Sequence, residues 1–217
     1  ALFRFSVQGN SDQSLEEGEA KQMASAPRLG FPDLYADNSG LEPGPALAKS
    51  SERSELIRLM ARRRSDREPS GAAVPLQAVT DILFSGMGIT RSVKNAVAEL
   101  PLPMTPSGGG RNPYEAYLFA RKVDGLAPGI YHYSAIDHTL GRLAGELPEK
   151  LGDVIGNQDW AGEMSCLIVL AAFFERTMWK YDDPNAYRVV LIEAGHIGQN
   201  MLLAATDAGL AACPTAA

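Results

Sequence analysis

Four segments of this 217-residue chain carry residue types and spacings that could do chemistry. The first is ARRRSDR, residues 61–67, in which Arg63, Ser65 and Arg67 fall at alternate positions. Alternate side chains of an extended chain point the same way, so two guanidinium groups and a hydroxyl would converge there. Such a set suits a phosphate or the carbonyl-rich edge of a heterocycle. Taken alone, the segment favours a simpler interpretation, a basic helix end that complements the helix dipole.

The second segment is PSGGGRNP, residues 106–113. Three consecutive glycines let a backbone approach a flat ligand closely and aim its N–H groups at acceptors. The segment has neither the Lys-Ser/Thr that ends a P-loop nor the G-x-G-x-x-G spacing of a Rossmann site, so neither is predicted. A flexible surface loop is an equally good interpretation of this segment by itself.

The third segment is FERTMWKYDDPNAYR, residues 174–188, which follows a run of apolar residues. Lys180 and Tyr181 are adjacent, so their side chains diverge on a regular helix or strand but could converge in a loop. An ammonium group beside a phenol favours the phenolate, which can act as a base. Lys-Tyr pairs are frequent, however, and Trp179 and Tyr181 could simply cover apolar surface.

The fourth segment is EAGHIGQN, residues 193–200, inside an expected helix. Gly195 and Gly198 leave a groove on one face, and each interior glycine costs about 1 kcal/mol relative to alanine. We therefore expect close packing there, by a second helix more readily than by a ligand. The chain has three histidines, all expected to be structural because no pair has metal-ligand spacing: His132, His138 and His196.

The elements that must position these segments follow from the spacing of apolar residues. Helices are expected at 51–63, 75–85 and about 188–208, since apolar residues recur on one face of each. Three residues are placed to bound them: Ser51 as an N-cap, Gly86 as a stop and Gly209 as a C-terminal cap.

Strands are expected at 116–123 and 130–133, joined as a hairpin, and a fully buried central strand at 166–174. Residues 101–113 are too rich in proline and glycine for regular structure. Helices separated by hairpin-like strands predict an α+β fold rather than a doubly wound sheet.

The chain divides into an irregular N-terminal arm at 1–50, with short local elements that could wrap another subunit, and a domain at 51–217. Its net charge of −6 argues against a nucleic-acid or anionic-membrane partner, because both need a basic face. Cys166 and Cys213 are too few for a disulfide framework or a zinc site. The apolar run at 164–174 is too short to span a bilayer and the N-terminus has no signal-peptide core, so we expect a cytoplasmic protein.

The order of the segments is more specific than any one of them. RRRSDR, PSGGGRNPYEAY, GLAPGIYHY, FERTMWKY and EAGHIGQNMLLAATDAGL follow one another from about residue 55 to the end. Together they closely resemble the azoline-dehydrogenase type of the FMN-dependent nitroreductase superfamily. The resemblance implies a nitroreductase-like FMN-binding α/β sandwich of the α+β class, and a homodimer with FMN at the subunit interface.

The resemblance also implies roles for particular residues. Lys180 and Tyr181 match the pair that azoline dehydrogenases use in catalysis. The positions that match FMN contacts are Arg63, Ser65 and Arg67, then Pro106, Ser107, Gly108 and Gly109 with Asn112 nearby, and finally Gln199 and Asn200 in the flavin-proximal helix. In the implied reaction Tyr181 removes a proton from a thiazoline or oxazoline ring, and a hydride passes to the flavin.

The implied substrate is a modified peptide, and a cyclodehydratase complex is left open as a further partner. Members of the family continue past ACPTAA with a helix and strand that usually supply a basic phosphate contact, so we expect either that the domain is truncated at its C-terminal end or that the protein binds FMN weakly. Two alternatives remain: a generic NAD(P)H-dependent nitroreductase or quinone reductase on the same fold, and a flavin-free scaffold partner of a cyclodehydratase.

Overall fold

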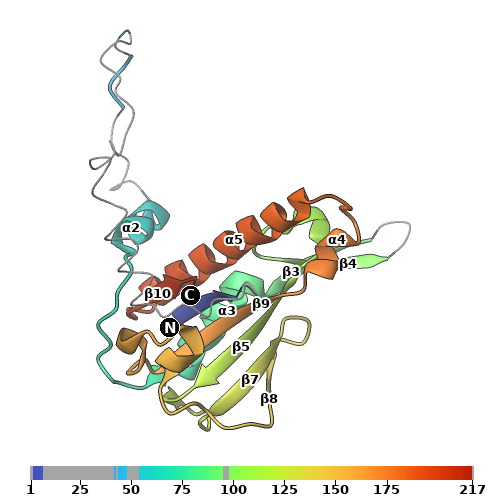
Figure 1. Cartoon of the computed structure of the whole chain (residues 1–217). Coiled ribbons are helices and arrows are strands. Elements are labelled where there is room, and N and C mark those ends of the chain that lie inside the picture. Colours follow the sequence, from blue (N-terminus) through green and yellow to red (C-terminus); the bar gives the residue numbers. More distant parts are fainter. Residues whose placement is uncertain (1, 7–41, 43, 48–53, 95–97, 217) are drawn as a thin grey trace, which may run out of the picture.

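The structure is a computed structural model, and it describes residues 2–6, 42, 44–47, 54–94 and 98–216 (Figure 1). Its elements in chain order are β1 (Leu2–Ser6), α2 (Glu55–Arg62), β2 (Val74–Pro75), α3 (Leu76–Met87), β3 (Ile89–Lys94), β4 (Glu99–Pro103), the 3-10 turn η2 (Gly108–Gly110), β5 (Tyr114–Ala120), β6 (Val123–Asp124), β7 (Gly129–Ser134), β8 (Thr139–Arg142), the 3-10 turns η3 (Leu151–Ile155) and η4 (Asp159–Ala161), β9 (Cys166–Ala172), α4 (Phe174–Met178), α5 (Asn185–Asp207) and β10 (Cys213–Thr215). No helix in these ranges is long and apolar enough to cross a membrane.

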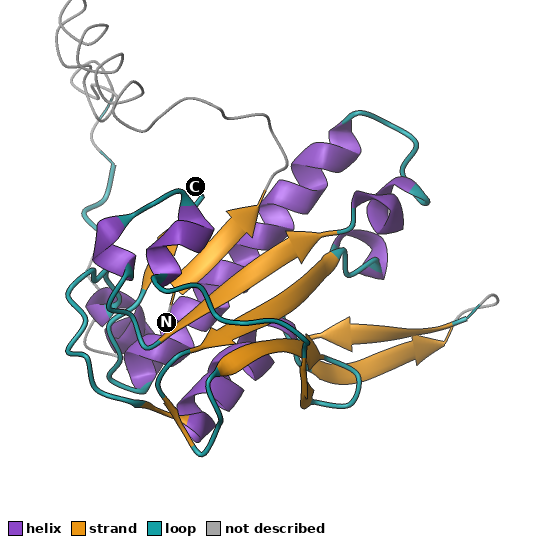
Figure 2. Cartoon of the chain, turned by 60° about the horizontal axis from the view of Figure 1, so that its bottom comes forward, coloured by secondary structure: helices purple, strands orange, loops and turns teal. Residues whose placement is uncertain are grey.

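A six-stranded mixed sheet ordered β10-β1-β9-β5-β7-β8 forms the centre of the fold. Its strand β9 is apolar on both faces: Ile168 and Leu170 pack toward α3 and α5, while Leu167 packs against Leu151 and Ile155 on the other face. Figure 2 shows the sheet with its helices packed around it. Fully burying one such side chain contributes about 1.5–3 kcal/mol. The expected buried central strand and the α+β fold are therefore confirmed.

The β5–β7 hairpin is amphipathic, as its alternating sequence predicts. Buried and half-buried residues alternate along both strands, and the strands pair antiparallel from Ala116↔Tyr133 to Ala120↔Gly129. The first strand ends at Ala120 rather than at residue 123, because the chain turns there and β6 leaves to pair with β2.

Helix α5 spans 23 residues and ends as its sequence predicts. Gly209 adopts a φ of 70°, a left-handed conformation that favours glycine. Its N–H donates to the Thr206 carbonyl at 3.1 Å, and the Leu210 N–H donates to the Ala205 carbonyl at 2.9 Å. These two bonds form a Schellman motif, which satisfies carbonyls that the helix end leaves free.

Two helix boundaries differ from the expectation. Helix α3 continues through Gly86 to Met87, so Gly86 does not stop it. A Cβ on Gly86 would lie 2.5 Å from Met201 Cε, so this glycine instead allows α3 and α5 to approach closely. Helix α2 begins at Glu55, and the predicted N-cap Ser51 lies outside the described residues.

Two segments expected to be irregular contain strands. Residues 101–103 belong to β4, which pairs antiparallel with β3. Prolines are tolerated there because β4 has a partner on one side only, as in an edge strand. At the N-terminus, Leu2–Ser6 form β1, which lies between β9 and β10 and is parallel to both. Most of the remaining arm lies outside the described residues, so the division at residue 50 stays a prediction.

Candidate active site

The glycine-rich segment forms a tight loop against α5. Asn112 N–H donates to Ser107 Oγ at 2.9 Å, and Gly110 N–H donates to the Ser107 carbonyl at 3.0 Å. Gly108 N–H donates to Glu193 Oε2, on α5, at 3.1 Å. The loop is therefore held by its own hydrogen bonds and by the helix, which disfavours the alternative of a flexible surface loop.

Glycine is required in this loop because other groups approach its backbone closely. A Cβ on Gly108 would lie 2.4 Å from Val189 Cγ1. Gly109 has a φ of 63°, and a Cβ there would lie 2.7 Å from Tyr181 Oη and 2.8 Å from Lys180 Nζ. The side chains of Lys180 and Tyr181 thus converge on one point above Gly109.

Lys180 and Tyr181 can converge because they lie just beyond the short helix α4. The backbone N–H groups of both residues donate to the Thr177 carbonyl, at 3.1 and 3.0 Å, which forms a tight turn rather than a continued helix. Lys180 Nζ lies 5.5 Å from the centre of the Tyr181 ring. The tyrosine is 36% exposed, so a ligand can reach the pair from solvent. The expected convergence in a loop is therefore confirmed, while the catalytic role stays a prediction.

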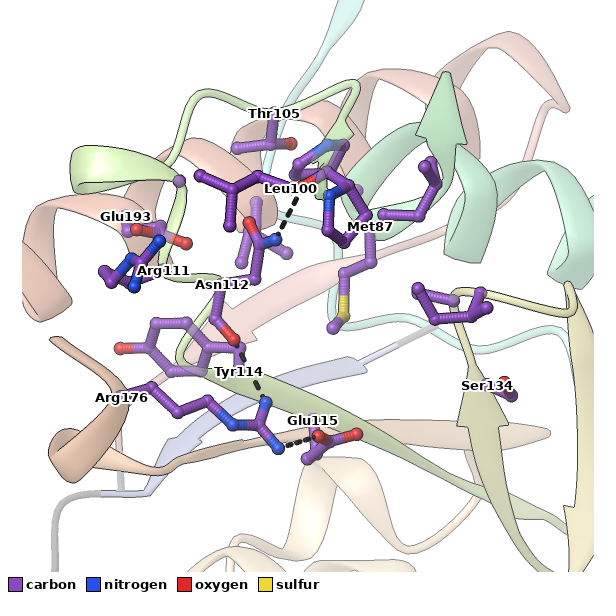
Figure 3. Close-up of a pocket in the computed structure, with 18 of the residues that line it drawn as sticks. Met87, Leu100, Thr105, Arg111, Asn112, Tyr114, Glu115, Ser134, Arg176 and Glu193 are labelled. Carbon is purple, nitrogen blue, oxygen red and sulfur yellow. Dashed lines mark hydrogen bonds and ion pairs between the residues drawn. The ribbon is translucent and has the colours of Figure 1, made fainter. Parts of the chain in front are cut away.

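Two arginines connect the loop to the segment that carries the Lys–Tyr pair. Arg176 Nη1 donates to the Asn112 carbonyl at 3.0 Å, and its Nη2 lies 2.5 Å from Glu115 Oε1 on β5 (Figure 3). Arg111 Nε donates to the Gly109 carbonyl at 3.2 Å, and its guanidinium stacks over the Trp179 ring at 5.2 Å. The loop and the pair are therefore fixed relative to each other.

Glu115 forms the centre of an ionic cluster on β5. Its Oε2 lies 2.7 Å from His132 Nε2, and its other oxygen contacts Arg176. Burial alone would raise the pKa of Glu115, but the hydrogen bonds to His132 and Arg176 lower it below its ordinary value. The carboxylate is thus held ionised as the anchor for Arg176.

A cavity of about 430 Å³ lies beside the loop. Apolar side chains from α3 and the β3–β4 hairpin, such as Met87 and Leu100, form part of its wall. Its polar groups include Asn112 from the glycine loop, Glu115 from β5, Arg176 from α4 and Glu193 from α5 (Figure 3). A cavity of this size and mixed lining is typical of a small-molecule site.

Sequence reasoning missed Glu193, although a signal was present. It lies on the apolar stripe of α5, next to Ala194 and one turn from Val190 and Ile197, where a charged residue is unexpected. It also missed Arg176 and Glu115, whose contact joins residues 61 positions apart. Nothing in a single sequence marks such a pair.

The Arg-x-Ser-x-Arg segment follows the end of α2, outside any helix or strand, and it lies away from the glycine loop. Asp66 N–H donates to the Ala212 carbonyl at 2.9 Å, so the segment runs beside the chain that leads into β10. The Arg67 guanidinium lies 5.3 Å from the Trp160 ring centre, Ser65 hydrogen-bonds the Cys213 thiol, and Arg63 is half-buried.

One chain does not bring this segment and the glycine loop together. The glycine loop contacts α5 at Val189 and Glu193, near the start of the helix. Arg64 and Asp66, which flank Ser65, line a pocket together with Thr206, near the end of the same helix. The helix between Glu193 and Thr206 is roughly 20 Å long at 1.5 Å per residue. Figure 1 shows α2 at one end of α5 and α4 at the other.

The remaining candidates on α5 divide into internal and exposed residues. Asn200 Nδ2 donates to the Ser85 carbonyl at 3.1 Å and to Thr105 Oγ1 at 3.0 Å, so it braces the start of the loop against α3. Gln199 is exposed. A Cβ on Gly195 would meet no described atom within 4 Å, so the expected close packing of a second helix is wrong at this position within one chain.

Two of the three histidines, His132 and His138, take part in local contacts. His132 pairs with Glu115, and His138 Nδ1 lies 2.8 Å from Tyr133 Oη. Over the part of the chain that the structure describes, no three His, Cys, Asp or Glu side chains are grouped to hold a metal ion.

Known proteins share both the sequence pattern and the fold. A nitroreductase-family profile matches residues 60–217. A protein of Methanocaldococcus jannaschii that carries the nitroreductase name is 31% identical over 163 residues, which are 73% of this chain and 77% of that protein. The trifolitoxin-processing protein TfxB of Rhizobium leguminosarum bv. trifolii is 32% identical over 151 residues, which are 67% of this chain and 40% of TfxB. The chain therefore belongs to the nitroreductase family, a family of oxidoreductases.

The fold is also similar to that of a solved complex. A chain of the Escherichia coli microcin synthetase McbBCD, solved with truncated pro-MccB17 bound, superimposes with a TM-score of 0.60 at 20% identity. The match covers 92% of this chain and 70% of the other. At this identity the likeness establishes the nitroreductase-like fold and nothing finer.

Proposed function

We propose that this protein is an FMN-dependent dehydrogenase that oxidises thiazoline or oxazoline rings in a modified peptide to the aromatic azoles. The observation that carries the proposal is the convergence of Lys180 Nζ and Tyr181 Oη above Gly109 of the glycine loop. The similarity to a trifolitoxin-processing protein, and to a synthetase complex that holds a microcin precursor, supports a peptide substrate. By the same analogy, a cyclodehydratase complex is a further partner.

The glycine loop fits the edge of a flavin ring. Gly109 N–H has no hydrogen-bond acceptor among the described residues, so it is a donor left for a ligand. The absence of a side chain at Gly109 lets Tyr181 Oη and Lys180 Nζ approach its backbone closely. When bound, FMN supplies the two-electron acceptor that the oxidation requires. Arg63 and Arg67, whose guanidinium groups can form bidentate hydrogen bonds, would hold its phosphate.

A homodimer follows from the separation of these two sets of residues. Since the Arg-x-Ser-x-Arg segment and the glycine loop meet opposite ends of α5, one FMN can touch both sets only if they come from two chains. In the proposed dimer, Arg63 and Arg67 of one protomer face the glycine loop of its partner.

Exposed apolar side chains support this dimer. Ile192 on α5 is 56% exposed, with Leu191 and Tyr187 beside it and the open surface of Gly195 one turn further. The apolar stripe of α2 is also exposed at Leu56 and Met60. Exposed apolar surface of this kind is typical of a protein–protein interface.

The side chains of the site have separable tasks in the proposed reaction. The ring loses two hydrogens overall, and Tyr181 takes one of them as a proton from a ring carbon. The Lys180 ammonium lies beside the phenol, so it can hold the Tyr181 oxygen at the ring carbon. Arg111 and Arg176 hold the loop and the pair in register, so that a bound ring meets both at once.

The test compares Tyr181→Phe with the wild-type protein and with Tyr117→Phe, a tyrosine on β5 away from the pair. Tyr181→Phe should retain bound FMN, measured by absorbance, and lose oxidation of a thiazoline peptide, measured as the loss of two hydrogens by mass spectrometry. Tyr117→Phe should keep both. Wild-type activity in Tyr181→Phe would overturn the assigned role.

Two further outcomes decide between the alternatives. Turnover of a nitroaromatic with NADPH that is unaffected by Lys180→Ala would favour the generic reductase over the azoline dehydrogenase. Wild-type protein that stays colourless after addition of FMN would favour the flavin-free scaffold.

A further inference from the structure

Glu193 is the one buried charged side chain in the described ranges, with 4% of its surface exposed. Burying a carboxylate is unfavourable unless hydrogen bonds compensate for the lost water. The neighbouring positions on the same face of α5, Val190, Ala194 and Ile197, are apolar, so packing alone would favour an apolar residue here. The carboxylate therefore needs an explanation other than the stability of the helix.

The partners of Glu193 all belong to the glycine loop. Its Oε2 accepts the Gly108 N–H at 3.1 Å, and the carboxylate also accepts a hydrogen bond from the Ser107 hydroxyl. The Ser107 oxygen in turn accepts the Asn112 N–H at 2.9 Å. One carboxylate on the helix thus holds the start of the glycine run directly, and Ser107 links it to Asn112 at the other end.

The direction of the Gly108 hydrogen bond determines which backbone amide of the loop is left for a ligand. Gly108 N–H turns inward to Glu193, whereas the next amide, that of Gly109, has no acceptor among the described residues, and a Cβ at Gly109 would lie beside Tyr181 and Lys180. A loop that rotated away from Glu193 would move both the free amide and the contact with the Lys–Tyr pair.

We propose that Glu193 is a positioning residue, which holds the loop from Ser107 to Asn112 so that Gly109 faces the Lys–Tyr pair and the flavin. This role rests on the proposed function, since it is the flavin and the azoline ring that the positioned loop would meet. Glu193 acts through the loop and does not contact the reacting atoms.

The experiment replaces Glu193 with Gln and uses Asp207→Asn, an exposed carboxylate on the same helix, as the matched control. A glutamine removes the negative charge and replaces one of the two acceptor oxygens with an NH2 donor, so the hydrogen bonds from Gly108 and Ser107 lose their charged acceptor. The loss of a hydrogen bond to a charged group corresponds to a change of roughly tenfold to a hundredfold.

Hydrogen exchange of the loop amides, without added FMN, should be faster by about this factor in Glu193→Gln and unchanged in Asp207→Asn. The dissociation constant for FMN, from quenching of flavin fluorescence, should rise similarly, and kcat should fall with little change in KM. A lower melting temperature together with unchanged loop exchange and FMN affinity would show that Glu193 is only structural, and would overturn the proposal.

A second variant keeps the test decisive if Glu193→Gln does not fold. Ser107→Ala leaves Glu193 its Gly108 hydrogen bond but removes both the bond from Ser107 to Glu193 and the acceptor of the Asn112 N–H, so exchange of the Asn112 amide should rise while that of Gly108 changes less. Unchanged exchange in Ser107→Ala would count against the relay. If the wild-type protein binds FMN but does not oxidise azolines, the reaction assigned above fails, whereas exchange and FMN affinity still decide the role of Glu193.

Discussion

Substituting alanine for Gly109 tests the geometry of the site directly, and Gly110→Ala provides a closely matched control. The two glycines are neighbours with nearly the same left-handed backbone, φ 63° and 66°. They differ in what a new methyl group would meet. At Gly109 it would lie 2.7 Å from Tyr181 Oη and 2.8 Å from Lys180 Nζ, whereas at Gly110 the nearest atom is Leu102 Cδ2 at 3.5 Å.

The shared backbone strain and the different contacts predict different patterns of loss. A non-glycine residue in the left-handed region costs about 1–2 kcal/mol, so both variants should lose this much stability. Carbon contacts are relaxed at about 3.5–4.0 Å, so the Tyr181 and Lys180 side chains must retreat by about 1 Å in Gly109→Ala. A misplacement of about 1 Å in a catalytic group lowers rates on the order of a hundredfold.

Urea unfolding and oxidation of a thiazoline peptide, measured on both variants, separate the two effects. We expect similar losses of unfolding free energy, about a hundredfold lower activity in Gly109→Ala, and activity within a few-fold of wild type in Gly110→Ala. Equal activities in the two variants would refute the conclusion that Lys180 and Tyr181 act at Gly109, whatever the stability measurements show.

Three other predictions concern the core, the buried carboxylate and the subunit interface. Gly86→Ala should lower the free energy of unfolding by about 1–3 kcal/mol through overpacking against Met201; an unchanged urea midpoint would contradict the close helix contact. Burial raises the pKa of Glu193 above its ordinary value of 4.5, despite its hydrogen bonds. The folded state therefore favours the protonated form at low pH, and this contribution to the free energy of unfolding is lost as the pH rises from 4.5 through the raised pKa. Wild-type protein should therefore lose stability relative to Glu193→Gln across this range in denaturation series, and a constant difference would show that the carboxyl does not titrate there. Ile192→Asp should give a monomer with weakened FMN binding in analytical ultracentrifugation and flavin titration, and a stable dimer would exclude this face as the interface.

The sequence by itself determined the elements whose signals are local. The apolar run of β9, the alternation of the β5–β7 hairpin and the long stripe of α5 with its Gly209 cap all depend on residues a few positions apart. The adjacency of Lys180 and Tyr181 and the glycine run were likewise visible, because each lies within one short segment.

Only the tertiary structure decided how these segments meet. The strand at Leu2–Ser6 exists because two distant strands flank it, and the proline-rich β4 is a strand because β3 pairs with it. The bond from Gly108 to Glu193 joins residues 85 positions apart, and it turns a glycine run that could have been a mobile loop into a fixed wall of the site. Such contacts depend on which surfaces the packed core brings together, and local propensity carries no information about that.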